Sequence, residues 1–179
     1  MGAPGMSDRQ PTEARNLDPY GNPPLEWSRA LKVLSEPPTA QSTWFLGTVD
    51  EALRPHAAGV GALYLDGDVY FTSSPRAFKA RNIAANPACT ISVGLDGIDL
   101  VLEGEAARVT DKDMLERAAA TYRKGGWPAQ VEGDALTAPY SAPSAGPPPW
   151  HLYRLTFHTV FGVATVEPNG ATRWRFGTT

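Results

Sequence analysis

The chain has 179 residues, of which 42% are hydrophobic, so it suits one domain with a full core and is too short for two large domains. Its 16 basic and 19 acidic residues give a net charge of -3, which excludes the global positive field that drives nonspecific nucleic-acid binding. No apolar run approaches the roughly 20 residues of a membrane helix, and the start has no basic segment followed by an apolar one. We therefore expect a soluble, cytoplasmic protein without nucleic-acid or membrane partners.

The first segment differs in composition from the rest of the chain. Residues 1–24 are rich in Pro, Gly, Asn and charge, which predicts a flexible N-terminal arm ahead of a single domain at residues 25–179. Apolar residues from Leu25 to Leu34 recur at helical spacing, and two prolines at positions 37 and 38 end this predicted helix.

The middle of the chain consists of short β-rich segments separated by turn residues. Five short β-rich segments occur before residue 110, at residues 42–49, 56–65, 68–73, 89–95 and 98–109. Asp66-Gly67 and Asp96-Gly97 each indicate a tight hairpin turn. These features predict antiparallel pairing of neighbouring segments.

Two helices, a long loop and three more strands complete the predicted elements. The helices are expected at residues 75–86 and 111–124, the second with Asp111 as N-cap and Gly125-Gly126 as its end. A loop dense in Pro, Ala and Gly covers residues 127–150, and strands are expected at residues 151–157, 159–166 and 172–176. Many antiparallel strands with few helices predict a mainly β fold with peripheral helices, closed into a small barrel.

A basic cluster stands at the start of the first of these two helices. With Ser74 as N-cap and Pro75 at the first helical position, the first-turn amides favour an anion. Arg76 and Lys79, three positions apart, would share one helix face, whereas Arg81 would face nearly the other way. Hydroxyls, a helix start and two convergent cations suit a phosphate monoester. The alternative is a set of solvated charges on a surface helix.

The residues around this cluster resemble a known family. The stretches "RPHAAGVGALYLDGDVYFTSS", "KARNIAANPACTISV" and "LVLEGEAARVTD" are similar to the pyridoxamine 5′-phosphate oxidase-like, FMN-binding split-barrel proteins, especially their flavin and deazaflavin oxidoreductase branch. The resemblance covers roughly residues 44–176. It implies a split β-barrel of the FMN-binding type. It also implies a homodimer that binds FMN, or the deazaflavin coenzyme F-420, in a groove at the dimer interface.

The resemblance also assigns roles to residues of the basic cluster. Carried over by position, Thr72, Ser73 and Lys79 would hold the cofactor phosphate. Arg81 and Asn82 belong to the same motif and would contact the phosphate or the ribityl chain. Arg76 stays a candidate on helical spacing alone.

The strand at residues 56–65 would lie beside the cofactor ring. It carries Ala58, Gly59, Val60 and Gly61, and its small residues allow a flat ring to approach the backbone closely. The alternative is a bulged barrel strand, which is compatible with a ligand.

One feature departs from the pattern of true pyridoxamine phosphate oxidases. These enzymes carry an additional arginine on the second strand and a basic C-terminal substrate motif, whereas this chain has Ala57 and Ala58 and ends in "TRWRF". We therefore do not assign pyridoxamine phosphate oxidation.

Aromatic and basic residues near the end of the chain are further candidates. Trp127, Tyr140, Trp150 and His151 lie in or beside the long loop, where they would cap a pocket as a lid or pack beneath the loop. In the last strand, alternation places Arg173 on one face and Trp174 on the other. Both are candidate cofactor-binding residues, the arginine toward the cofactor tail or the partner chain; the alternative is a solvated edge strand.

Other common catalytic arrangements do not occur in the sequence. His56 and His158 are isolated from other ligands, which predicts no metal site, and Cys89 lies in an apolar run typical of a buried thiol. No catalytic side chain is identified, as suits a flavin enzyme whose cofactor performs the hydride chemistry. We expect an FMN-dependent oxidoreductase acting on an unidentified small molecule. The alternatives are an F-420-dependent reductase and a noncatalytic flavin- or haem-binding split-barrel protein.

Overall fold

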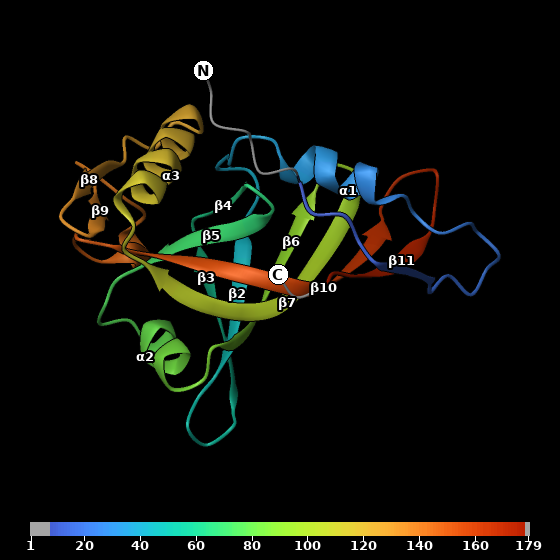
Figure 1. Ribbon diagram of the computed structural model, residues 1–179, viewed down its shortest axis with the longest axis horizontal. Helices are drawn as coiled ribbons and strands as arrows, with labels where there is room; N and C mark the ends of the chain where they lie inside the picture. Colours follow the sequence, from blue (N-terminus) through green and yellow to red (C-terminus); the bar gives the residue numbers. More distant parts are fainter. Residues whose placement is uncertain (1–7, 178–179) are drawn as a thin grey trace.

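Strands dominate the computed structural model, which describes residues 8–177 (Figure 1). The strands are β1 (Glu13–Asn16), β2 (Trp44–Val49), β3 (Pro55–Val60), β4 (Ala62–Leu65), β5 (Asp68–Ser73), β6 (Ala88–Leu95), β7 (Ile98–Val109), β8 (Gln130–Glu132), β9 (Ala135–Thr137), β10 (His151–Ala164) and β11 (Ala171–Arg175). The helices are α1 (Trp27–Leu34), α2 (Phe78–Ala85), α3 (Lys112–Lys124) and the short 3-10 helix η1 (Pro143–Ala145). The predicted mainly β fold with peripheral helices is confirmed.

A single antiparallel sheet forms the body of the molecule. It has nine strands, seven of them in the order β1-β11-β10-β7-β6-β2-β3, while β5 pairs with both β10 and β4. The strand β10 changes neighbours along its length, pairing with β5 near its start and with β11 near its end. This change of partner lets the sheet curl around a core (Figure 1).

The strand β10 also corrects one prediction. Residues 151–157 and 159–166 were expected as two strands, but β10 runs continuously from His151 to Ala164. Its pairing with β7 is irregular between Phe157 and Thr159. A bulge of this kind bends a strand without ending it, so the sequence pattern is interrupted while the strand continues.

The prediction of a single strand at residues 56–65 is also corrected, because the structure has two strands there. The two strands, β3 and β4, separate at Gly61 and pair with different partners, β2 and β5. The predicted turn at Asp66-Gly67 is confirmed, because both residues have the positive φ angles, 54° and 89°, that a two-residue hairpin turn of this kind needs.

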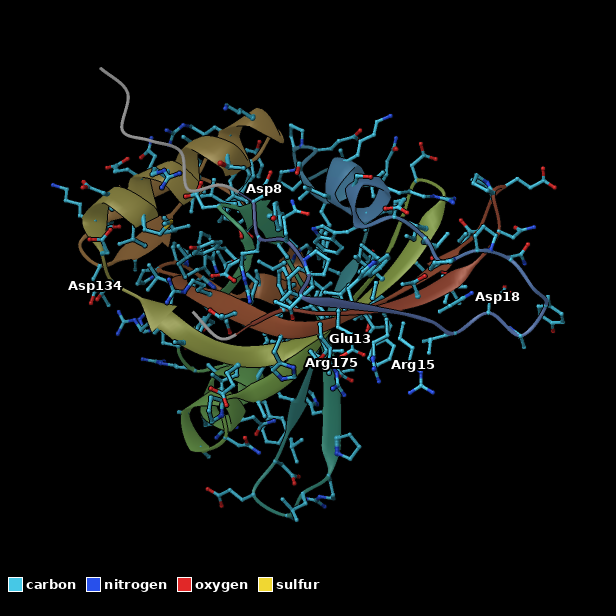
Figure 2. All side chains as sticks on the ribbon, turned by 45° about the vertical axis from the view of Figure 1, so that its right-hand side comes forward. Asp8, Glu13, Arg15, Asp18, Asp134 and Arg175 are labelled. Carbon is cyan, nitrogen blue, oxygen red and sulfur yellow. The ribbon has the colours of Figure 1, made fainter. Side chains whose placement is uncertain are left out.

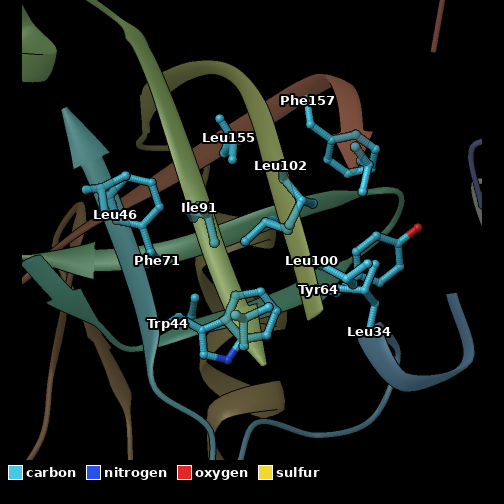
Figure 3. Close-up of a cluster of buried hydrophobic side chains, with 14 of the residues drawn as sticks. Leu34, Trp44, Leu46, Tyr64, Phe71, Ile91, Leu100, Leu102, Leu155 and Phe157 are labelled. Carbon is cyan, nitrogen blue, oxygen red and sulfur yellow. The ribbon is translucent and has the colours of Figure 1, made fainter. Parts of the chain in front are cut away.

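The core lies in two clusters on either side of β5. Side chains from the sheet fill the larger cluster, among them Leu46, Phe71, Ile91, Leu100, Leu102, Leu155 and Phe157 (Figure 3). The smaller cluster packs Leu63 and Tyr70 of the β4–β5 hairpin against Leu115, Ala118 and Tyr122 of α3. The alternation along β5 thus buries both of its faces, and α3 is fixed beside the hairpin.

The predicted N-terminal arm contains regular structure. Residues 13–16 form β1 and pair with β11, and the Thr12 amide donates to the Arg175 carbonyl at 2.8 Å. An edge strand presents unpaired backbone groups, and β1 satisfies those of β11, so the expectation of an unstructured segment is corrected there. Residues 1–7 of the predicted arm lie outside the described residues. Within residues 8–177, no helix has the length and apolarity needed to cross a bilayer.

Candidate functional site

A pocket of about 490 Å³ lies where the sheet, α2 and the long loop meet. One side comes from the β3–β4 junction, the end of β5 and the first turn of α2. The other side comes from the segment before β2, the end of α3 and the loop before β10. The polar and aromatic side chains that line it include Ser42, Trp44, Thr72, Ser73, Ser74, Lys79, Tyr122, Trp127, Tyr140, Ser141, Ser144 and Trp150.

The predicted phosphate residues meet at one end of this pocket. Thr72, Ser73 and Lys79 all line it, together with Ser74. The strand β5 brings the hydroxyls to the pocket, and α2 starts five residues after β5 ends, which brings Lys79 back to the same place. The structure therefore brings together the three residues that the family resemblance assigned to the phosphate.

Lys79 is half-buried, and its surroundings leave its charge uncompensated. Burial lowers the pKa of its ammonium group below the ordinary value of 10.5, and no carboxylate of the described residues counters this effect. A bound anion would restore the stability of the charged form, because an opposite charge at short range favours ionisation. This end of the pocket is therefore electrostatically suited to an anionic group.

The backbone beside the hydroxyls is held by α3. The Gly61 carbonyl accepts hydrogen bonds from the Thr72 amide at 3.2 Å and from the Tyr122 hydroxyl at 2.7 Å. Burial raises the pKa of Tyr122, so this hydroxyl stays protonated and remains a donor. Tyr122 thus ties the β3–β4 junction to the end of β5.

The small residues of β3 leave open space beside the pocket. A Cβ atom at Gly59 would meet only Thr43, at 3.8 Å, and one at Gly61 would meet only Thr72, at 3.8 Å. Both glycines line the pocket, so a side chain there would project into the pocket without clashing with the chain. Val60 lines the pocket as well, whereas Ala58 does not. These glycines therefore suit the close approach of a flat ligand.

The start of α2 differs from the prediction and removes Arg76 from the site. The helix begins at Phe78, and residues 74–77 form a turn in which the Ala77 amide donates to the Ser74 carbonyl at 3.1 Å. Pro75 fits this turn because its fixed φ angle suits the second turn position as well as a first helical position. Arg76 is exposed outside the helix and does not line the pocket, so its predicted convergence with Lys79 is wrong.

Arg81 and Asn82 lie away from the pocket. The Arg81 guanidinium is exposed and lies over the Phe78 ring at 5.5 Å. Asn82 is buried and donates to the Thr48 hydroxyl at 3.0 Å, which ties α2 to β2. In this chain the two motif residues contact the protein, and neither lines the pocket.

The two candidates on β11 are also outside the pocket. Arg173 pairs with Glu13 of β1 at 2.8 Å, and Arg175 lies 3.8 Å from the same carboxylate. Figure 2 shows Glu13 and Arg175 close together on neighbouring strands. Trp174 is buried on the opposite face, with its ring packed edge-on against Trp27 at 5.3 Å. The alternation predicted for β11 is confirmed, but it points Trp174 into the core.

The aromatic residues of the long loop line the other side of the pocket. Trp127, Tyr140 and Trp150 all contribute, whereas His151 does not. The loop is more regular than expected, because it contains the β8–β9 hairpin and η1. Of the two readings, the structure favours aromatic side chains that border a pocket.

Sequence reasoning missed two groups of lining residues. The segment before β2 and the first residue of β2 contribute Ser42 and Trp44, and α3 contributes Tyr122. Tyr122 follows the apolar spacing of a core helix, so only its hydroxyl hints at a polar partner. The segment before β2 carries no motif, and only the folded sheet places it beside α3.

The sequence matches the family model described as pyridoxamine 5′-phosphate oxidase over residues 32–164. No curated protein gives a significant match. Among similar solved structures is a haem-binding protein from Mycobacterium smegmatis, with a TM-score of 0.57 and 16% identity over 82% of this chain and 57% of that chain.

Two further solved structures have the same architecture. The General Stress Protein 26 from Bacillus anthracis gives a TM-score of 0.53 and 16% identity over 75% of this chain and 91% of that chain. A pyridoxamine 5′-phosphate oxidase-related, FMN-binding protein from Nostoc punctiforme gives 0.50 and 20% identity over 82% of each chain. At these identities the structural likeness shows a common fold, and with the family match it confirms the predicted split β-barrel.

Proposed function

The chain belongs to the pyridoxamine 5′-phosphate oxidase family, and from that premise we propose that it is an FMN-dependent oxidoreductase acting on a small molecule. The observation that carries this proposal is Lys79, a half-buried cation without a compensating carboxylate in the described chain, beside the hydroxyls of Thr72 and Ser73. An FMN phosphate supplies the anion that this group of side chains suits.

The pocket residues divide between the parts of FMN. Thr72, Ser73 and Lys79 would bind the phosphate by charge-assisted and hydroxyl hydrogen bonds. Gly59 and Gly61, with open space before their Cα atoms, would let the ring lie against β3. When bound, the flavin supplies the capacity to accept and donate hydride equivalents, and the protein's part is binding, orientation and exclusion of water.

The arginines of the chain favour FMN over the deazaflavin alternative. Coenzyme F-420 carries an oligoglutamate tail, which would need free cations along its path. Arg173 and Arg175 share Glu13, and Arg54 pairs with Asp50 at 2.9 Å, so each of these three arginines already has an acidic partner in its own chain. Glu13 offers one negative charge to the two arginines of β11, so these cations are partly compensated without a ligand.

The haem-binding alternative is less well supported by the pocket. No histidine, cysteine or methionine of residues 8–177 lines it, whereas these are the usual protein ligands of haem iron. Its anion-binding end gives a reason to prefer a phosphate-bearing ligand. The additional arginine of true pyridoxamine phosphate oxidases is replaced by alanine on β3, so the proposal does not include that reaction.

A homodimer is part of the proposal. The strand β3, which lines the pocket, lies at the end of the sheet order, so the pocket borders a sheet edge. The outer face of the same sheet exposes Phe45 on β2, Val101 on β7 and Val163 on β10. Exposed apolar side chains on one sheet face are typical of a subunit interface.

Sedimentation of the protein with Phe45→Glu tests the proposed dimer. A buried charge would weaken the interface, so this variant should sediment as a monomer at concentrations where the wild type is a dimer. The control is Tyr20→Glu, because Tyr20 is 88% exposed in the N-terminal segment. A monomeric wild type with FMN bound would contradict the proposal.

Titration with FMN and riboflavin tests the cofactor assignment. The cofactor-free protein should bind FMN about 10- to 150-fold more tightly than riboflavin, since only FMN gains the charge-assisted contacts to Lys79. Equal affinities for FMN and riboflavin would contradict the proposed phosphate site. Catalysis is tested by reducing the bound FMN and following its reoxidation by small oxidants; reoxidation no faster than that of free reduced FMN would indicate a binding protein.

A further inference from the structure

The wall of the pocket that the long loop contributes has a distinct chemistry. We call it the loop wall and define it by its lining residues Trp127, Tyr140, Ser141, Ala142, Ser144, Ala145 and Trp150. It combines aromatic rings with small hydroxyl side chains. None of its members carries a carboxyl, amino, guanidinium or imidazole group.

The polar atoms of its indole rings are already engaged. The Trp127 Nε1 donates to the Tyr140 carbonyl at 2.8 Å, and the Trp150 Nε1 donates to the Ala145 carbonyl at 3.1 Å. Trp150 is 2% exposed and backs the wall from within, so the accessible ring surface comes from the partly buried Trp127 and the exposed Tyr140. The two indole rings also pack edge-on against each other, with centroids 5.5 Å apart.

The aromatic group is anchored to α3. Trp127 packs edge-on against Tyr122 at 5.1 Å, and Tyr122 in turn donates to the Gly61 carbonyl. The loop wall is thus connected to the same residues that position the phosphate end. This arrangement makes the loop wall a prepared surface, since its rings keep their orientation through contacts within the chain.

The loop wall contributes no charged side chain to the pocket. Of the side chains of residues 8–177 that line the pocket, Lys79 is the single charged one. Arg123, near the end of α3, donates instead to the Ala129 carbonyl at 2.7 Å. A charged substrate against the loop wall would lose hydration without meeting an opposite charge, whereas a neutral ring loses little.

We propose that the loop wall selects the substrate of this enzyme, and that the substrate is an uncharged, planar ring compound. The proposal rests on the proposed FMN site, because the phosphate would occupy Lys79, the one lining cation among residues 8–177. The ring of the substrate packs against the carbon surfaces of the loop wall. The hydroxyls of Ser141 and Ser144 are available to a carbonyl or hydroxyl group on that ring.

Three probes that share a naphthalene ring and carry a neutral, an anionic or a cationic substituent test this selection. They are naphthol, naphthalene sulfonate and naphthylmethylammonium, measured by equilibrium dialysis against the FMN-loaded protein. Naphthol should bind at least about 10-fold more tightly than either ion, because an unpaired charge must be desolvated. Equal or tighter binding of either ion would overturn the proposal.

A pair of tyrosine variants assigns the binding to the loop wall. Tyr140→Ala removes a ring that is 62% exposed, so folding is expected to persist, and naphthol affinity should fall about two- to ten-fold. Tyr20→Ala, also an exposed ring but outside the pocket lining, should leave the affinity unchanged. The same affinity in both variants and the wild type would place the probe elsewhere and overturn the assignment.

A pair of lysine variants tests the role of charge directly. Ser144→Lys places a cation on the loop wall and should improve sulfonate binding about two- to five-fold. Ser28→Lys makes the same change on an exposed position of α1 outside the pocket and should have no effect. Identical results for the two variants would contradict selection by the loop wall.

The proposed FMN site and this selection fail in distinguishable ways. If FMN does not bind, the probes are measured with the Lys79→Ala protein, which lacks the one lining cation in the described chain. If the Lys79→Ala protein still prefers the neutral probe, substrate selection by the loop wall would be supported although the FMN proposal would be wrong. FMN binding without neutral-probe preference would retain the FMN site and overturn the substrate class.

Discussion

Two basic regions of this chain look alike in sequence and differ in the folded protein. Lys79 follows the end of β5, and Arg173 and Arg175 lie on β11, and each group was a candidate for binding an anionic cofactor. In the structure, Lys79 lines a pocket and has no carboxylate partner among the described residues. The two arginines share Glu13 of β1 instead.

The difference shows that a cation marks a ligand site only when the fold leaves it uncompensated. Burial lowers the pKa of Lys79, which means that the folded protein disfavours its charge until an anion binds. On β11, Glu13 already supplies a negative charge beside Arg173 and Arg175. The predictions below test this contrast, starting with the largest expected effect.

Lys79→Ala should weaken FMN binding about 10- to 150-fold, since it removes a charge-assisted hydrogen bond worth about 1.5–3 kcal/mol. Riboflavin affinity should stay unchanged because riboflavin lacks the phosphate. Alanine is the best helix former, so the melting temperature of the cofactor-free protein should change little. Fluorescence titration with both flavins measures the effect, and an equal loss for riboflavin would contradict the phosphate role.

The charge of Lys79 also predicts a pH dependence of FMN affinity. In the cofactor-free protein the lowered pKa means that Lys79 loses its proton below pH 10.5, so FMN affinity should decline toward alkaline pH before that value is reached. For stability the sign is opposite: the unfolded chain holds this proton longer, so Lys79 contributes stability that rises with pH. A Lys79→Ala protein should lose this alkaline decline in affinity; a decline of the same size in the variant would assign it to another group.

Tyr122→Phe should reduce the free energy of unfolding by about 0.5–1.5 kcal/mol, because the Gly61 carbonyl loses one of its two donors. FMN affinity should fall more than riboflavin affinity if this contact positions Thr72. Tyr20→Phe is the matched control, since Tyr20 is exposed. Chemical denaturation and flavin titration together measure both effects, and a stability loss without any change in the FMN-to-riboflavin ratio would make Tyr122 purely structural.

Arg173→Ala should leave FMN affinity within about two-fold of wild type, in contrast to Lys79→Ala. The substitution should act on stability through the lost contact with Glu13. A double-mutant cycle with Glu13→Ala should give a coupling of about 0.2–1 kcal/mol in the free energy of unfolding. A loss of FMN affinity as large as that of Lys79→Ala would show that β11 also reaches the cofactor.

Arg81→Ala should have the smallest effect of the series. Arg81 is exposed over the Phe78 ring and does not line the pocket, so both FMN affinity and stability should stay near wild type. Flavin titration checks this directly. A several-fold loss specific to FMN would indicate that the family motif acts on the phosphate from outside the pocket.

Local rules predicted those features that depend on neighbouring residues. Asp66-Gly67 forms a hairpin turn because both residues tolerate positive φ. Asp111 caps α3 because its carboxylate reaches the Met114 amide, at 2.9 Å. The sequence motif also pointed to Thr72, Ser73 and Lys79, and all three line the pocket.

The tertiary structure decided which predicted residues reach the site. Arg173 meets Glu13, a residue 160 positions away, and Trp174 is covered by Trp27 of α1. Neither partner is visible in the spacing around β11, because such contacts depend on how distant segments pack.

The amino-acid sequence by itself determined the β-rich pattern, the turns, the caps of α3 and the hydroxyl and lysine residues of the candidate phosphate site. Only the tertiary structure showed that Trp44, Tyr122 and the long loop surround one pocket. It also showed that α2 begins at Phe78 and not at the predicted Pro75. The physical reason is how far apart along the chain the interacting residues lie. Turns and caps follow from interactions a few residues apart, whereas pairing, burial and the uncompensated charge of Lys79 arise from chain segments that the sheet brings together.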